Sequence, residues 1–344
     1  MNASPRSLQL EVYPMLGHRH PRRDGWRVLV QGRIVRDAEL TLGKRLLLKG
    51  LQRALRNTGE SVTSQLFFDR VEGFLAAPEQ RRRVYVDIDG TSYRLRRKSK
   101  SSGLFVGKLD LPEGVFGNLM SRANRGYATA SVQVHIVGEN STTAVGEIFL
   151  ASPSGISVVS DIDDTIKRTC VTSRREMLAQ TFLRPFEAID GMAHVYQHWQ
   201  QQGALFHYVS SSPWQIFQPL QKFLDEHHFP SGSMHLRWFR LRDEMFKRWR
   251  LLRRKSKGGT IVGMMSRLPQ RRFVLIGDSG ERDPEIYAKI AQKLPHQVAM
   301  VAIRDLEERP MDHRRHLRIL RKMGTVPLFK FQQADQIRDL LQHL

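Results

Sequence analysis

The 344-residue chain contains a single cysteine, Cys170, so no disulfide can form within it. Its first residues include no apolar segment of the kind that forms a secretory signal, and no window approaches about 18 uninterrupted apolar residues. We therefore expect a soluble protein of a reducing compartment, the cytoplasm. We expect no transmembrane helix and at most peripheral contact with a membrane.

The sequence also lacks the motifs of several common cofactor sites. Neither Gly-x-Gly-x-x-Gly nor Gly-x-x-x-x-Gly-Lys-Ser/Thr occurs, so no nucleotide cofactor is predicted. Cys170 has no base assigned to it and is not interpreted as a nucleophile. Six histidines have no cysteine partners and no zinc spacing, and we interpret them as surface or packing residues: His194, His198, His207, His227, His228 and His235.

Acidic residues are few relative to basic ones. Against 34 Asp and Glu stand 55 Lys and Arg, which gives a formal net charge of +21 and predicts attraction to nucleic acid, anionic lipid or acidic substrates. The chain has two basic clusters, and each can be interpreted either as a binding patch or as an ordinary solvated helix face. One cluster is Arg248, Arg250, Arg253, Arg254, Lys255 and Lys257, and the other is Arg314, Arg315, Arg318, Arg321 and Lys322.

The first part of the chain reads as a short tail and a β-rich domain. Residues 1–22 are polar and predict a tail, whereas 23–152 contain short alternating segments that predict a small sandwich-like domain. Residues 40–55 repeat leucine every three or four positions, which predicts an inserted amphipathic helix that packs on its own domain or lies on a membrane surface. The predicted strands are 26–35, 84–88, 92–96, 104–111, 128–136 and 145–150.

The pattern changes after Pro153-Ser-Gly155, so 153–344 form the second predicted domain. Short apolar segments, each followed by a helical stretch, are typical of a parallel sheet covered on both faces. The second half is therefore predicted to be an α/β domain. Its predicted strands are 156–160, 205–210, 273–277 and 298–303.

Two acids follow the first of these strands, in Asp161-Ile-Asp163-Asp-Thr165. Ligands of an open parallel sheet bind outside the carboxyl ends of its strands, where these acids would lie. One carboxylate can attack a phosphoryl group, and a second can protonate the leaving alkoxide and then deprotonate the hydrolytic water. Because clustered acids need a counter-charge and Mg²⁺ prefers oxygen ligands, the motif predicts a magnesium site.

Three further motifs lie at comparable positions along the chain. Ser210 ends the second predicted strand, where a hydroxyl and backbone N–H groups form an anion cradle. Lys257 precedes a predicted helix and can neutralise an aspartyl-phosphate. Asp278 ends the third predicted strand and Asp283 follows five residues later, so these acids can complete a metal site with Asp161.

A second copy of the first motif occurs in the β-rich region, as Asp87-Ile-Asp89-Gly-Thr91. Nothing downstream in that region supplies the serine, lysine and second acid pair. Asp89-Gly90 is a favourable hairpin turn dipeptide between two alternating segments. We predict that this copy has a structural role only.

The order acid pair, hydroxyl, lysine, acid pair resembles the haloacid dehalogenase phosphotransferase family. Longer segments look like the catalytic domain of actin-patch-type phosphatidate phosphatases and their bacterial relatives: 160–167, 180–186, 191–192, 208–214 and 273–287. The resemblance runs from about residue 155 to the C-terminus, and the β-rich half resembles the sandwich that often precedes this domain in bacterial members. One departure is Ser256 before Lys257, where members usually have histidine.

The resemblance implies a parallel-sheet, three-layer haloacid dehalogenase-like domain without a large cap. The implied reaction is Mg²⁺-dependent removal of phosphate from phosphatidate, which leaves diacylglycerol. The implied roles are Asp161 as nucleophile and metal ligand, Asp163 as acid/base and main-chain metal ligand, Ser210 and Lys257 as phosphate ligands, Thr165 as a positioning residue, Asp278 as a metal ligand and Asp283 as support for the metal site.

Two substrate classes and a non-catalytic role remain open. Only about 40 residues separate Thr165 from the second strand, and about 43 separate Pro213 from Lys257, which is too few for a substantial cap. An uncapped site suits a headgroup on a membrane, and it also suits a phosphorylated end of DNA or RNA. Trp214, Trp238 and Trp249 are interpreted as packing residues rather than base-stacking ones. A binding module without catalysis is the third alternative.

Overall fold

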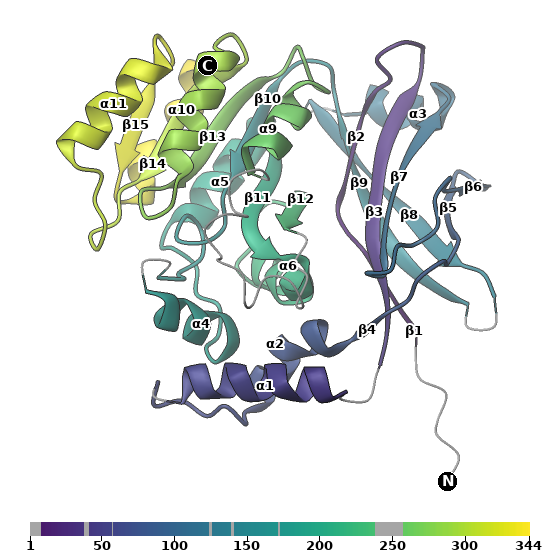
Figure 1. The fold of residues 1–344 in the computed structure, drawn as a ribbon. Helices are drawn as coiled ribbons and strands as arrows, with labels where there is room; N and C mark the ends of the chain where they lie inside the picture. The colour runs from purple at the N-terminus through teal and green to yellow at the C-terminus, as the bar shows by residue number, and fades with distance from the viewer. Residues whose placement is uncertain are drawn as a thin grey trace. The chain divides into compact units, whose positions relative to one another are not determined.

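The computed structural model describes residues 8–37, 41–56, 58–123, 126–138, 141–170, 173–237 and 257–344. The chain divides into two compact units, one of Met1–Leu47 with Glu72–Pro153 and one of Leu48–Val71 with Ser154–Leu344. Figure 1 shows a β-rich region and a region in which strands alternate with helices. The sequence placed the inserted helix with the β-rich part, whereas Leu48–Val71 group with the second unit.

The first unit is built on one nine-stranded sheet. Its order is β1-β3-β2-β9-β8-β5-β6, with β4 and β7 paired to β3. All pairings are antiparallel except that of β2 with β9. The strands are β1 (Leu8–Val12), β2 (Met15–Arg19), β3 (Trp26–Arg36), β4 (Ala77–Pro78), β5 (Val84–Ile88), β6 (Thr91–Arg94), β7 (Leu104–Leu111), β8 (Tyr127–Ile136) and β9 (Thr142–Ala151).

The prediction of a polar tail over 1–22 is wrong for the described part of that segment. Strands β1 and β2 lie within it, and Tyr13 and Met15 are buried. The alternation Leu-Gln-Leu-Glu-Val of β1 is short and adjoins polar residues, so it does not stand out locally. Pairing with β3 supplies the partner that makes it a strand.

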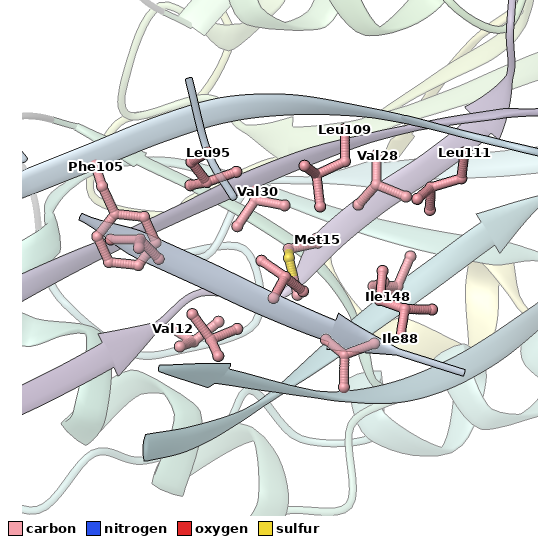
Figure 2. Close-up of a cluster of buried hydrophobic side chains, with 14 of the residues drawn as sticks. Val12, Met15, Val28, Val30, Ile88, Leu95, Phe105, Leu109, Leu111 and Ile148 are labelled. Carbon is pink, nitrogen blue, oxygen red and sulfur yellow. The ribbon is translucent and has the colours of Figure 1, made fainter. Parts of the chain in front are cut away.

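The strands of this sheet enclose a common apolar core. Figure 2 shows part of it, with Met15, Val30 and Ile148 among side chains that lie between strands. Leu95, just after β6, packs over Gly107 of β7, where an added Cβ would lie 2.8 Å from its side chain. The segment after β6, at one end of the strand order, therefore meets β7, which pairs with β3 near the other end. The β-rich prediction is confirmed, with the strands paired in a single sheet.

Along the described part of the sequence, three helices occur between these strands: α1 (Leu42–Leu55), α2 (Gln65–Leu75) and α3 (Gly114–Ser121). The predicted amphipathic helix corresponds to α1. Leu55 at its end is buried, whereas Leu42 and Leu46 near its start are 76% and 62% exposed. The leucine stripe of α1 is thus only partly covered.

The second unit contains a six-stranded parallel sheet in the order β12-β11-β10-β13-β14-β15. The four predicted strands are confirmed and form its centre, and β12 and β15 are the edge strands that the sequence analysis missed. The strands are β10 (Ile156–Ser160), β11 (Leu205–Pro213), β12 (Gly232–Arg237), β13 (Arg272–Asp278), β14 (Val298–Arg304) and β15 (Leu328–Phe331). The helices are α4 (Arg174–Phe182), α5 (Met192–Gln201), α6 (Phe217–Glu226), α9 (Lys257–Met265), α10 (Asp283–Lys293) and α11 (His313–Met323).

The strand order places a topological switch point between β10 and β13. The chain moves outward from β10 through β11 to β12, crosses back to β13 beside β10, and then moves outward again through β14 to β15. In such sheets ligands bind outside the carboxyl ends of the strands on either side of the reversal. The mixed α/β architecture is confirmed, while the three-layer haloacid dehalogenase-like assignment stays a prediction.

Candidate active site

The first acid pair follows β10 directly, at the switch point. Asp161 is 1% exposed, and its backbone N–H donates to the carbonyl of Ile276 in β13 at 2.9 Å. Asp278 is the last residue of β13 and is also fully buried. Because neighbouring parallel strands end at the same edge of the sheet, two acids far apart in the sequence meet there.

Asp161, Asp278 and Asp283 form one acidic cluster. Each offers an oxygen, and these three oxygens lie within 4.8 Å of one another. One oxygen of Asp278 accepts from the backbone N–H groups of Gly280 and Glu281, at 2.7 and 3.0 Å. The Oδ2 atoms of Asp161 and Asp278 are buried and have no hydrogen-bond partner among the described residues. Buried carboxylate oxygens without donors are costly, and a hard cation would satisfy both.

Lys257 joins the nucleophile candidate to the third acid. It is the first residue of α9, and its Nζ donates to both oxygens of Asp283 at 2.6 Å. The same Nζ lies 2.9 Å from Asp161 Oδ1. The tyrosine hydroxyl of Tyr287 lies 3.3 Å from Asp283 Oδ2 and donates to the Ile276 carbonyl at 3.0 Å. Asp283 is therefore engaged mainly by the protein's own cation.

Gly277 has a steric role at this site. A Cβ added there would lie 2.2 Å from Asp283 Oδ2, far inside contact distance. The glycine before Asp278 therefore allows the carboxylate of Asp283 to approach the end of β13. This explains the Gly-Asp dipeptide in physical terms.

Asp163 has four side-chain partners. Lys167 Nζ lies 2.9 Å from its Oδ1, and Thr169 donates to the same oxygen at 2.9 Å. Ser210 and Ser212 donate to Oδ2 at 3.0 and 2.7 Å. Lys167, Thr169 and Ser212 were not identified from the sequence. The only local signal was the Ser-Ser-Ser run near the end of β11, which does not indicate which hydroxyl points inward.

Asp164 shapes the turn that holds these groups. Its φ of 54° lies in the left-handed region, which glycine, asparagine and aspartate adopt most readily. One of its carboxylate oxygens accepts from the backbone N–H groups of Thr169 and Cys170, at 2.7 and 2.9 Å. Asp164 thereby fixes the segment from which Thr169 reaches Asp163.

A family model and a curated relative point to the same family. The model of the catalytic domain of phosphatidate phosphatase APP1 matches residues 156–305, a range that contains the acidic cluster, Lys257, Ser210 and the surroundings of Asp163. Phosphatidate phosphatase APP1 of Saccharomyces cerevisiae is 31% identical over 245 residues, which is 69% of this chain. Residues 156–305 belong to the APP1 catalytic-domain family.

The similarity covers only part of the curated relatives. The chain spans 40% of the yeast protein. An uncharacterised protein of Schizosaccharomyces pombe is 32% identical over 166 residues, which is 47% of this chain and 27% of that one. A solved structure of an uncharacterised Listeria monocytogenes protein covers 55% of this chain at 10% identity, with a TM-score of 0.34, too low to argue a common fold.

Electrostatics separate the two acids of the first APP1-type motif. Burial raises the pKa of Asp161 well above its usual value, Lys257 opposes this, and the neighbouring acids add to it. Burial also raises the pKa of Asp278. Burial alone would raise the pKa of Asp163, but Lys167 and the donated hydrogen bonds outweigh it and lower that pKa to about 2. The protein's own groups therefore keep Asp163 ionised. Around Asp161 the positive charge of Lys257 is not enough to offset burial and the neighbouring acids.

Lys257 is ionised in spite of its burial. Burial by itself lowers the pKa of its ammonium group, but Asp161 and Asp283 outweigh this effect and raise the pKa well above its usual value. The lysine predicted from the sequence thus lies inside the acidic cluster. The histidine that APP1-type members usually have before it corresponds to Ser256, which lies outside the described residues.

The remaining predicted residues divide into three groups. Thr165 is buried, and its hydroxyl has no partner within the part of the chain that the structure describes. Trp214 is 2% exposed, as its packing interpretation requires, whereas Trp238 and Trp249 lie outside the described residues. The basic cluster at 248–255 also lies outside them. The cluster at 314–322 lies on α11.

The second Asp-x-Asp motif forms a hairpin, as predicted. Ile88 of β5 pairs with Thr91 of β6, and Asp89 and Gly90 form the turn with φ of 49° and 72°. Asp87 lies 2.9 Å from a ring nitrogen of His135 on β8. Over the described ranges, the potential metal-binding cluster consists of Asp161, Asp278 and Asp283 and includes no acid of this hairpin. No described helix has the length and apolarity needed to cross a bilayer.

Proposed function

We propose that the chain is a Mg²⁺-dependent phosphatidate phosphatase that acts through an aspartyl-phosphate on Asp161. The observation that carries this proposal is the pair of buried oxygens on Asp161 and Asp278 that no described donor satisfies. Membership of the APP1 catalytic-domain family supports the choice of reaction and substrate. The haloacid dehalogenase-like fold and the residue roles given below are parts of the same proposal.

Asp161 is the proposed nucleophile. Its Oδ2 has no described donor and would hold magnesium, which leaves Oδ1, the oxygen that Lys257 contacts, to attack phosphorus. The free oxygen of Asp278 and the main-chain carbonyl of Asp163 would complete the metal site, and Asp283 would support it through Lys257. Magnesium bound there supplies positive charge that neutralises the carboxylates and the phosphate oxygens.

Asp163 is the proposed acid and base. With a pKa of about 2 it is ionised at neutral pH before substrate binds. A phosphate group beside it adds negative charge, which raises the pKa and favours protonation. The protonated carboxyl then donates to the leaving alkoxide, and the carboxylate that remains takes a proton from the water that cleaves the aspartyl-phosphate. Lys167, Thr169 and Ser212 keep its carboxylate in one orientation through both steps.

Ser210, Lys257 and Thr165 are the proposed phosphate ligands and positioning groups. Lys257 carries the buried positive charge of the site, and positive charge near transferring phosphoryl oxygens stabilises the transition state. The hydroxyl of Ser210 donates to Asp163 in the absence of substrate and can turn to a phosphate oxygen. The buried hydroxyl of Thr165 has no described partner, so it can donate a hydrogen bond to a phosphate oxygen or position the motif backbone.

The test is phosphate release by the purified full chain with Mg²⁺ and with excess chelator. The substrates are phosphatidate vesicles, lysophosphatidate, diacylglycerol pyrophosphate, oligonucleotides with 3′- or 5′-phosphates, and a small aryl phosphate. We expect Mg²⁺-dependent release from the lipids. Release from oligonucleotides alone would replace the lipid substrate by nucleic-acid ends, and no release from any substrate would support a binding module instead.

A further inference from the structure

Helix α11 presents a face of basic and apolar side chains to solvent. Its sequence, His-Arg-Arg-His-Leu-Arg-Ile-Leu-Arg-Lys-Met, contains no acidic residue. Residues three and four apart lie on one side of a helix, so its exposed positions form one surface. We call this surface the arginine–leucine face and define it as Arg314, Leu317, Arg318, Leu320 and Arg321, all exposed. Leu317 and Leu320 are 38% and 37% exposed.

The opposite side of α11 is fixed to the rest of the second unit. Ile319 and Met323 are 1% and 2% exposed. The helix begins after Asp312, whose side chain accepts from the backbone N–H of Arg315 at 2.7 Å. Figure 1 shows α11 in yellow beside β15 and α10. The arginine–leucine face is therefore the outer surface of a well-packed helix.

Arg315 connects α11 to the loop that follows Asp278. Its guanidinium donates to both oxygens of Glu285, at 2.9 and 3.0 Å. It also donates to the carbonyls of Ser279 and Glu281, at 2.6 and 2.9 Å. Arg315 is next to Arg314, so the arginine–leucine face starts in the same helical turn that contacts this loop.

The segment that leads into α11 makes a second connection to the same loop. Arg309 donates to the carbonyl of Gly280 at 2.7 Å, and the hydroxyl of Ser279 donates to the carbonyl of Arg309 at 2.8 Å. The beginning of α11 and the loop after Asp278 thus form one hydrogen-bonded assembly. The position of the arginine–leucine face relative to the acidic cluster is fixed by these bonds.

We propose that the arginine–leucine face docks the chain on an anionic phospholipid surface. Arginine side chains bind lipid phosphates, and leucines between them can enter the headgroup region, as in helices that lie on membranes. Exposed leucines gain nothing from contact with a phosphate backbone, and α11 contains no Phe, Tyr or Trp on which a base could stack. The matched family range ends at residue 305, so this face lies beyond it.

Docking in this way would bring lipid headgroups to the edge of the sheet that carries the acidic cluster. This part of the inference rests on the proposed function, because it supposes that the substrate is a membrane lipid. It predicts that hydrolysis of vesicle-bound phosphatidate depends on the arginine–leucine face. Hydrolysis of a dispersed short-chain phosphatidate or an aryl phosphate should not.

The experiment compares the wild-type full chain with Arg314→Glu/Arg318→Glu/Arg321→Glu. Co-sedimentation is measured with phosphatidylcholine vesicles with and without phosphatidylserine, which is anionic and contains no phosphomonoester. A basic residue near an anionic leaflet contributes a factor of about five to binding, so we expect about 100-fold weaker binding to the anionic vesicles. The matched control is Lys222→Glu/Arg272→Glu/Lys293→Glu, which makes the same charge change at exposed residues outside α11 and should bind within a few-fold of wild type.

A second variant, Leu317→Ser/Leu320→Ser, keeps the charge and tests the apolar contribution. We expect weaker vesicle binding than for wild type, and this difference should remain at high salt because it does not depend on charge. Equal losses in the arginine variant and its control would overturn the inference, because binding would then follow net charge alone. The inference would also be overturned if the arginine variant bound vesicles as wild type does but no longer bound oligonucleotides. Vesicle docking through α11 without any phosphatidate hydrolysis would leave the inference intact and refute the proposed function. Circular dichroism and thermal unfolding check that each variant is folded.

Discussion

The chain contains the sequence Asp-Ile-Asp twice, and the two copies fold differently. Asp87 and Asp89 lie in an antiparallel hairpin, where the side chain of Asp87 is 35% exposed. Asp161 and Asp163 follow the central strand of a parallel sheet, where the side chain of Asp161 is 2% exposed. The same residue types thus form a turn in one unit and a buried charge cluster in the other.

The difference between the copies lies in their surroundings, not in their own residues. The fourth position of each motif has a left-handed backbone, with φ of 72° at Gly90 and 54° at Asp164. The copy at the switch point is surrounded by partners from other strands and helices, which the described surroundings of the hairpin do not match. These partners are Lys257, Asp278 and Asp283 around the first acid, and Ser210 and Ser212 around the second. The proposed reaction requires that these groups meet at the switch point of the parallel sheet.

The largest expected effect comes from removing the first acid of each copy. Asp161→Asn should reduce kcat at least about 10⁴-fold because it removes the proposed nucleophile. Asp87→Asn, the same change in the hairpin, should leave kcat unchanged. Hydrolysis of an aryl phosphate measures both. If Asp161→Asn were as active as wild type, the proposal that this copy is catalytic and the hairpin copy is not would be contradicted.

The next effect concerns the cation that only the second copy has. Lys257→Met should reduce kcat/KM about 10²- to 10³-fold, because it removes the buried charge beside Asp161 and Asp283. Lys289→Met, on the exposed side of α10, is the matched control and should retain full activity. Steady-state kinetics on folded protein would measure the loss. A loss shared by both variants would point to overall charge instead.

A third effect concerns the end of the parallel sheet that does not carry the acidic cluster, where buried histidines should make stability depend on pH. Near its amino ends, the rings of His207 and His235 both lie within hydrogen-bonding distance of the Ser233 hydroxyl, at 2.7 and 3.0 Å. Burial, with a smaller contribution from Arg267, lowers the pKa of His235 to about 4. The folded state thus keeps His235 neutral while the unfolded state takes up a proton below about pH 6.5.

The free energy of unfolding should therefore fall as pH decreases from about 6.5 to about 4, by up to about 3 kcal/mol from this residue alone. His235→Gln should flatten that dependence, and His194→Gln, at an exposed position, should not. Urea unfolding at a series of pH values measures the slope. An unchanged slope in His235→Gln would contradict the assignment.

The sequence predicted the centre of the second unit well because its signals are local. Each of the four inner strands is a mainly apolar segment, and each motif lies at the end of a strand or the start of a helix. The edge strands β12 and β15 are shorter or less apolar, and β1 depends on its partner strand β3. The groups around Asp163 were missed because their contacts join separate elements, and spacing along the chain does not reveal which hydroxyl faces the carboxylate.

The smallest effect tests one left-handed aspartate in each copy, the third residue of the hairpin copy and the fourth residue of the copy at the switch point. Asp89 and Asp164 both have positive φ, so replacement by alanine should cost about 1–2 kcal/mol of stability at each, whereas asparagine should be tolerated. Asp164→Ala also removes the acceptor for Thr169 and Cys170, so it should lower kcat as well. Asp89→Ala should lower stability alone, because the hairpin turn holds no reacting group. Thermal unfolding and kcat measured on the same four variants separate strain from positioning, and a kcat loss in Asp89→Ala would show that the hairpin copy takes part in the reaction after all.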